Sequence, residues 1–93
     1  MYQCRSDVSI ITARQTVPRK RIPRPSILDQ FESLGAPHGE RRWRSHGGKR
    51  LYTWDSLHGE IEVFNGRGKH LGSMDSLTGE MVKPAVRGRM IDV

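Results

Sequence analysis

The sequence predicts an α+β fold, mainly an antiparallel β-sheet of four or five short strands with one short N-terminal helix. Residues 51–64 alternate apolar and polar side chains on both sides of a turn at 56–59, as a β-hairpin does. Two further turn signals, at 65–66 and 75–79, separate additional strand-like segments. Apolar residues at helical spacing precede the hairpin, over 26–34.

The composition indicates one small domain with a modest core. The chain has 93 residues, of which 34% are hydrophobic, and its mean hydropathy is −0.65. A chain of this length buries roughly 60–65% of its unfolded surface. No apolar run is long enough to span a membrane, and no apolar segment of a conventional secretory signal peptide is present. The single cysteine, Cys4, excludes an intrachain disulfide.

The charge is unevenly distributed along the chain. Residues 1–50 hold 11 Lys/Arg against 4 Asp/Glu, whereas residues 51–93 hold 5 against 6, and the whole chain carries +6. A basic first half before an acidic hairpin suits a polyanionic ligand. The basic half would bind this ligand, and the hairpin would carry out chemistry on it. A solvated basic tail is the simpler alternative.

Residues 1–25 are interpreted as a basic, proline-containing arm, and residues 26–93 as the folded domain. Partial alternation over 7–13 predicts an edge strand. Prolines and cations over 16–26 predict an extended segment that contacts phosphate or an acidic protein, or serves as a plain linker.

The short helix is predicted over 26–34. Ser26 and Asp29 form an approximate capping box, and Gly35 ends the helix. A helix of about nine residues does not persist alone, so its apolar side must pack on the sheet. That apolar side consists of Ile27, Leu28, Phe31 and Leu34.

The hairpin divides into two faces. A turn centred between Leu57 and His58 sets Trp54 opposite Ile61 and Tyr52 opposite Val63, which makes these four one apolar face. His58 lies at the tip. The other face carries polar residues bounded by Leu51 and Phe64, namely Thr53, Asp55, Glu60 and Glu62.

The remaining strands are predicted at 69–74 and 80–83, where Pro84 weakens further pairing, with a final short strand within 87–93. The sheet as a whole is expected over about 41–93. The basic segment 41–44 contains Trp43, which is typical either of a buried tryptophan between exposed arginines or of a nucleic-acid contact.

The polar face of the hairpin favours acid–base chemistry. Four histidines without close spacing or paired cysteines do not favour zinc, although Asp55, Glu60 and Glu62 could hold magnesium. Crowded carboxylates repel, which would raise a pKa and supply a base, and an imidazole supplies an acid near neutral pH. RNA cleavage without metal needs a base, an acid and a cation. The alternative is that this polar face is only solvated and has no catalytic role.

A resemblance to a known family rests on two runs, Lys49-Arg-Leu-Tyr-Thr-Trp-Asp-Ser-Leu-His-Gly-Glu-Ile-Glu-Val-Phe64 and His70-Leu-Gly-Ser-Met-Asp-Ser-Leu-Thr-Gly79. They resemble the ribonuclease domain of the ribosome-inactivating E-type colicins and cloacin. The matching pattern is Tyr-x-Trp-Asp-x-x-His-Gly-Glu-x-Glu, then His-Leu-Gly-Ser-x-Asp-x-x-Thr-Gly. The resemblance covers about residues 40–93.

The resemblance implies a strongly twisted antiparallel sheet and a toxin that cleaves 16S ribosomal RNA in the decoding region of the small subunit. It implies no metal or other cofactor and a 2′,3′-cyclic phosphate product. It also implies an acidic immunity protein as partner and action in the bacterial cytoplasm of the target cell. Non-catalytic RNA or ribosome binding on the same fold, or cleavage of tRNA, are the alternatives.

The family's catalytic positions fall on Glu62 as general base, His58 as general acid, Asp55 as the residue that orients His58, and Arg89 as the cation for the phosphorane. The match at Arg89 requires a one-residue deletion in the 65–69 turn. The candidates for substrate contact are Lys83, which matches an RNA-contacting lysine, together with Lys49, Arg50, Arg42, Glu60 and Tyr52, and the cations of 19–24 and 41–50.

Two departures from the family pattern are visible. A tyrosine associated with the active site is Phe64 here, and the C-terminus is less basic than in the family. Receptor-binding and translocation parts are absent, so we expect an excised toxin domain, a small free-standing relative or the end of another delivery system.

Overall fold

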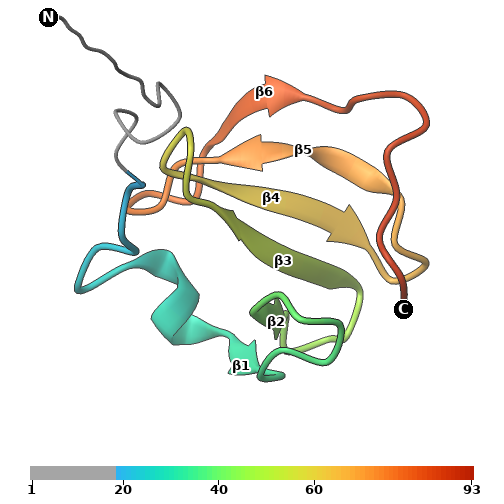
Figure 1. The fold of residues 1–93 in the computed structure, drawn as a ribbon, viewed down its shortest axis with the longest axis horizontal. Coiled ribbons are helices and arrows are strands. Elements are labelled where there is room, and N and C mark those ends of the chain that lie inside the picture. Colours follow the sequence, from blue (N-terminus) through green and yellow to red (C-terminus); the bar gives the residue numbers. More distant parts are fainter. Residues whose placement is uncertain (1–18) are drawn as a thin grey trace, which may run out of the picture.

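The computed structural model describes residues 19–93, and in this part of the chain six strands form one antiparallel sheet (Figure 1). Each strand pairs with the next in sequence. The predicted edge strand at 7–13 and Cys4 lie outside the described residues. The strands are β1 (Glu32–Ser33), β2 (Arg42–Arg44), β3 (Arg50–Asp55), β4 (Glu60–Asn65), β5 (His70–Met74) and β6 (Met81–Pro84).

The predicted helix over 26–34 is wrong beyond its first turn. Only a 3-10 helix, η3 (Ile27–Gln30), forms. Its capping box is confirmed, because Ser26 Oγ accepts from the Leu28 N–H at 3.2 Å and Asp29 Oδ2 accepts from the Ser26 N–H at 3.1 Å. The sheet class is therefore confirmed, whereas the helix is reduced to a single short turn.

Strand pairing and aromatic stacking replace the rest of that helix. Phe31 is extended, with φ −109° and ψ 162°, and its ring stacks on Tyr52 with centroids 4.3 Å apart. Glu32 then pairs with Arg44 as the start of β1, and the two side chains form an ion pair. An isolated helix of about nine residues is marginal in water. The chain therefore pairs with β2 instead of continuing the helix.

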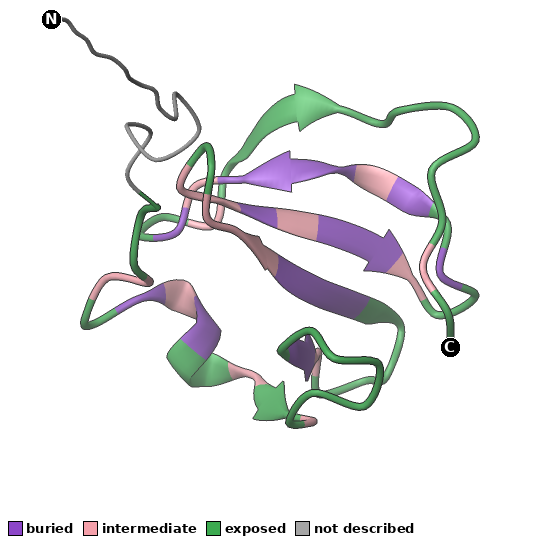
Figure 2. Ribbon diagram, in the orientation of Figure 1, coloured by how far each residue is buried: buried purple, intermediate pink, exposed green. Residues whose placement is uncertain are grey.

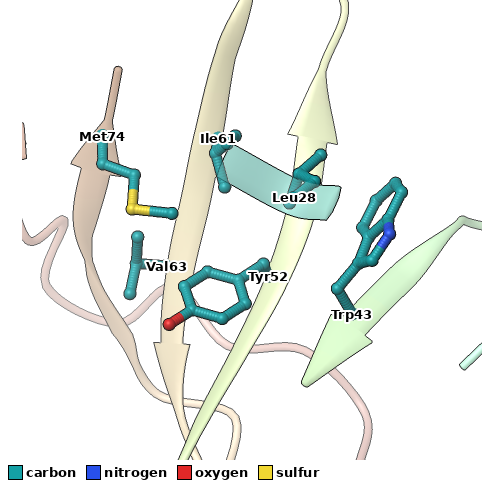
Figure 3. Packing of buried hydrophobic residues seen from close by; sticks show 6 residues of the cluster. All are labelled: Leu28, Trp43, Tyr52, Ile61, Val63 and Met74. Atoms are coloured by element: carbon teal, nitrogen blue, oxygen red, sulfur yellow. The ribbon is translucent and has the colours of Figure 1, made fainter. Parts of the chain in front are cut away.

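The predicted register of the central hairpin is confirmed. Trp54 pairs with Ile61, and Tyr52 pairs with Val63. The apolar face of these strands is covered by the η3 segment, and Figure 3 shows Leu28 above it. The buried cluster on this face consists of Leu28, Trp43, Tyr52, Ile61, Val63 and Met74. Trp54 is only partly buried, and its indole N–H donates to the Lys20 carbonyl at 2.9 Å.

A β-bulge shifts the pairing of β4 with β5 between Val63 and Phe64. Val63 pairs with Gly72, but Phe64 pairs with His70, so His70 shares the face of Phe64. Gly72 has φ +141°, and a Cβ there would lie 2.4 Å from the Lys83 carbonyl oxygen. Glycine therefore allows β6 to approach β5 closely at this point.

The C-terminal residues do not form the expected final strand. Beyond β6, which is the exposed edge of the sheet (Figure 2), an isolated bridge joins Lys69 to Met90. The segment 85–93 runs back past the ends of β4 and β5 (Figure 1). The count of six strands exceeds the predicted four or five, chiefly because the two-residue β1 gave no sequence signal.

Candidate active site

A row of polar residues crosses the face of the sheet opposite η3. The register places Arg42 beside Thr53, Thr53 beside Glu62, Glu62 beside Ser73, and Ser73 beside Lys83. Toward the hairpin tip, on this same face, Asp55 pairs with Glu60. The alternation of β3 and β4 thus brings the three hairpin carboxylates to one face, as predicted.

Asp55 organises the turn that carries His58. Its Oδ1 accepts from the N–H groups of Leu57 at 3.0 Å and His58 at 3.1 Å, and its Oδ2 lies 2.7 Å from His58 Nδ1. The Nδ1 atom is thereby engaged, and the half-exposed ring leaves Nε2 for a reacting group. The predicted pairing of these two residues is present.

These contacts also set the ionisation of Asp55. Burial acts to raise the pKa of Asp55, but hydrogen bonds from the His58 ring, the His58 N–H and the Leu57 N–H, with the charge of His58, outweigh burial and hold this pKa below the ordinary carboxyl value. Crowding of carboxylates predicts a raised pKa for at least one of them, and Asp55 is not that one: its pKa is lowered, and it remains an anion that holds the His58 ring.

Glu62 and Arg89 form an ion pair across the sheet face. Arg89 Nη1 lies 2.6 Å from Glu62 Oε1, and the Glu62 side chain is only 15% exposed. The residue far along the chain that was assigned by resemblance thus reaches the predicted base. A guanidinium in this position can neutralise Glu62 in the free protein or turn toward an anionic substrate.

Backbone hydrogen bonds hold the segment that presents Arg89. The Arg89 carbonyl accepts from the His70 N–H at 3.0 Å, and the Gly68 carbonyl accepts from the Ile91 N–H at 2.9 Å. A Cβ on Gly68 would lie 2.3 Å from the Ile91 oxygen, so glycine is needed for this close approach. Further along, the Asp92 carbonyl accepts from the guanidinium of buried Arg42.

Glu60 and Lys83 form the third pair on this face. Lys83 Nζ lies 2.9 Å from Glu60 Oε1, and the lysine side chain is half-exposed. Both residues were candidates for substrate contact, and the structure brings them together beside Asp55. Their pairing places a cation at the edge of the face where a phosphate could approach.

Each hairpin carboxylate therefore has its own positively charged or protonatable partner. These are His58 for Asp55, Lys83 for Glu60 and Arg89 for Glu62. Within residues 19–93, no group of three or more His, Cys, Asp or Glu side chains converges in a way that could hold a metal ion. The face is built from separate ion pairs, which suits proton transfer and binding of an anion.

Four of the residues proposed for substrate contact do not join these ion pairs. Tyr52 is buried in the core, where burial raises the pKa of its hydroxyl and the charge of Arg50 only partly offsets the rise. Arg42 is 5% exposed and anchors the C-terminal segment. Lys49 and Arg50 are exposed at the end of β3 away from the hairpin tip.

His70 is a residue of this face that the sequence reasoning missed. It is 2% exposed, its Nε2 lies 3.5 Å from Glu62 Oε1, and its ring packs edge-on against Phe64. The bulge between Val63 and Phe64 is what turns His70 toward Glu62. Gly72 inside a strand was the available signal, since an isolated strand glycine indicates a bulge.

A basic groove lies on the opposite face and meets the hairpin tip at Ser56. Its volume is about 1230 Å³, and its walls include the partly buried Trp54. The segment that forms one wall is fixed to the tip, because the Lys20 N–H donates to the Ser56 carbonyl at 2.7 Å. The charged residues of the groove are Lys20, Arg21, Arg24, Asp29, Glu40 and Arg41, so cations outnumber anions.

Comparisons with known proteins give one family. The model of the family described as Cytotoxic matches residues 22–92. A comparison with curated proteins gave no match. Within the part of the chain that the structure describes, no helix is long and apolar enough to cross a membrane. The match spans the sheet, the hairpin and the C-terminal segment, and the chain therefore belongs to the family of the cytotoxic domains of the E-type colicins and cloacin.

Proposed function

We propose that the protein is a toxin endoribonuclease that cleaves 16S ribosomal RNA in the decoding region of the small subunit and so arrests translation. The observation that carries the proposal is that the central hairpin carries an Asp55–His58 couple and, on the same face, Glu62 paired with Arg89 of the C-terminal segment. Together they supply a base, an acid and a cation, the three groups that metal-independent RNA cleavage requires.

The reaction begins at the ribose 2′-hydroxyl. The Glu62 carboxylate takes the 2′-hydroxyl proton, and the 2′-oxygen attacks the adjacent phosphorus. Negative charge develops on the phosphorane, where the Arg89 guanidinium stabilises it. Arg89 must release Glu62 Oε1 to do so, and release also frees the carboxylate to act as a base.

In the second half of the reaction, His58 protonates the leaving 5′-oxygen. The protonated ring donates Nδ1–H to Asp55 and gives its Nε2 proton to the 5′-oxygen as the phosphorus–oxygen bond breaks. The products are a 2′,3′-cyclic phosphate and a free 5′-hydroxyl. The ionised Asp55 accepts from Nδ1 and keeps the His58 ring oriented for this transfer.

Positive charge outside the hairpin supports binding of RNA and of an acidic immunity protein. The chain carries +6, and Lys83 lies beside the catalytic pairs. The basic groove at the hairpin tip combines arginines with Trp54, a combination typical of single-stranded nucleic-acid sites. We place action in the cytoplasm of the target bacterium, where ribosomes are found.

Incubation with intact ribosomes tests the proposal. We expect one discrete fragment from the 3′ region of the small-subunit RNA, which begins with a 5′-hydroxyl at the cut, and a longer upstream fragment that ends in a 2′,3′-cyclic phosphate, with and without EDTA. Loss of cleavage in EDTA would contradict the metal-independent mechanism. Intact ribosomal RNA together with cleaved tRNA would identify a tRNA nuclease, and intact RNA of both kinds would identify a binding module.

A further inference from the structure

His70 is hydrogen-bonded to both ends of the stretch 86–89, which presents Arg89. Its backbone N–H donates to the Arg89 carbonyl at 3.0 Å, and its Nδ1 accepts from the Val86 N–H at 2.9 Å. The ring is 2% exposed and lies against Phe64, with centroids 5.2 Å apart. A solvated histidine ring would make neither the Val86 bond nor the Phe64 contact.

The Val86 bond fixes where the ring proton lies. Because Nδ1 accepts a backbone hydrogen bond, the single proton of the neutral imidazole is on Nε2. That N–H has no hydrogen-bond partner among the described residues, although it is buried, and it faces Glu62 Oε1 at 3.5 Å. An unpaired buried donor is costly, so its placement beside the proposed base calls for a functional reason.

Two donors converge on one oxygen of Glu62. Arg89 Nη1 is bonded to Oε1 at 2.6 Å, and His70 Nε2 lies 3.5 Å from the same atom. No hydrogen bond to Oε2 is found within residues 19–93. The geometry therefore distinguishes the two oxygens, with Oε1 held and Oε2 left to accept a proton.

We propose that His70 is a positioning residue of the ribonuclease reaction, whose Nε2–H takes over Glu62 Oε1 when Arg89 turns to the substrate phosphate. The inference rests on the proposed function. Without His70, the departure of Arg89 would leave Glu62 with no donor and free to rotate. A small movement closes the 3.5 Å gap, as catalytic hydrogen bonds often shorten when substrate binds. No proton is transferred from His70.

Two substitutions at position 70 distinguish the role of Nδ1 from the role of Nε2. In His70→Asn, the amide oxygen replaces Nδ1 as acceptor for Val86, but nothing reaches Glu62. In His70→Gln, the longer amide places an N–H near the position of Nε2. The measurements are the single-turnover rate of ribosomal RNA cleavage, RNA affinity and thermal unfolding.

We expect His70→Asn to cleave about 10- to 100-fold more slowly, the effect of losing one hydrogen bond to a charged group, with RNA affinity unchanged. His70→Gln should recover part of the rate even where it is the less stable variant. Cleavage by His70→Asn at the parent rate, or equal losses in both variants, would overturn the inference. A parent protein that cleaves no RNA would instead overturn the proposed function.

A measurement on the unmodified protein does not depend on how the variants fold. Nitrogen-15 NMR of the histidine rings should place the His70 proton on Nε2, and this proton should exchange more slowly once an uncleavable 2′-deoxy decoding-region RNA is bound. A proton on Nδ1, or an exchange rate that RNA does not change, would contradict the proposed role.

Discussion

Arg89 Nη1 lies 2.6 Å from Glu62 Oε1, although 27 positions separate the two residues in the sequence. Glu62 is placed by the regular alternation of β4, whereas Arg89 lies on an irregular segment held by hydrogen bonds to β5 and to the β4–β5 turn. The arginine that we propose as catalytic is therefore only as well positioned as the C-terminal segment that presents it.

Arg42 should stabilise the C-terminal segment rather than bind substrate. Its buried guanidinium donates to the Asp92 carbonyl, so Arg42→Ala should lower the free energy of unfolding by about 2 kcal/mol, the usual value for a hydrogen bond that involves a charged group. Urea unfolding gives this quantity, with exposed Arg67→Ala as the matched control. An Arg42→Ala protein as stable as the control would show that the anchor contributes nothing.

The same substitution should impair cleavage beyond its effect on stability. With the Asp92 anchor lost, Arg89 samples more positions, and the rate constant for cleavage should fall while RNA affinity changes little. Rates are to be measured well below the unfolding temperature of each variant. If affinity falls and the rate at saturating RNA does not, Arg42 contacts RNA after all.

Asp55 should make a contribution to stability that depends on pH. Because hydrogen bonds and the His58 charge hold the pKa of Asp55 below the usual carboxyl value of 3.8, the folded state favours the ionised form. The contribution is complete above the usual value and disappears as pH falls through the lower pKa of the folded protein. The difference in unfolding free energy between the parent and Asp55→Asn should therefore be largest near neutral pH.

Urea unfolding over a pH series measures this difference in unfolding free energy between the parent and Asp55→Asn. The control is Asp92→Asn, at an exposed carboxylate whose side chain makes no hydrogen bond within the described part of the chain. The Asp55→Asn difference should shrink below the usual carboxyl pKa, while the Asp92→Asn difference stays small throughout. A difference for Asp55→Asn that grows in acid would reverse the assigned direction of the pKa shift.

The basic groove should contribute to RNA affinity but not to chemistry. Replacing Arg21, Arg24 and Arg41 by alanine should weaken binding to small-subunit RNA without changing the single-turnover rate at saturation. The slope of log affinity against log salt should fall by about one for each arginine that contacts a phosphate. Arg67→Ala serves again as the control. Unchanged affinity and slope in the triple variant would remove the groove from the RNA-binding surface.

The central hairpin could be predicted from sequence because its signals are local. Alternation in β3 and β4 around one tight turn fixes the pairing of Trp54 with Ile61, and with it the face that carries Asp55 and Glu62. The capping box at Ser26 was equally local. Such features depend on neighbours in the sequence, so periodicity is sufficient to find them.

The features that sequence reasoning missed depend on contacts between distant segments. Phe31 leaves the helix because its ring stacks on Tyr52, and the short β1 that follows is held only by β2. His70 reaches Glu62 through a bulge in β5 pairing, and Arg42 is buried because the C-terminal segment closes over it. Tertiary packing overrides local propensity at each of these points.

The measurement that tests the central claim most directly is single-turnover cleavage of small-subunit RNA in intact ribosomes by Glu62→Gln and His58→Ala. Glu80→Gln and His46→Ala, at exposed positions outside the site, are the matched controls. We expect each catalytic variant to lose about 10²- to 10⁴-fold in rate, with unfolding midpoints close to the parent, while the controls cleave normally. Cleavage at the parent rate by both folded variants would contradict the account.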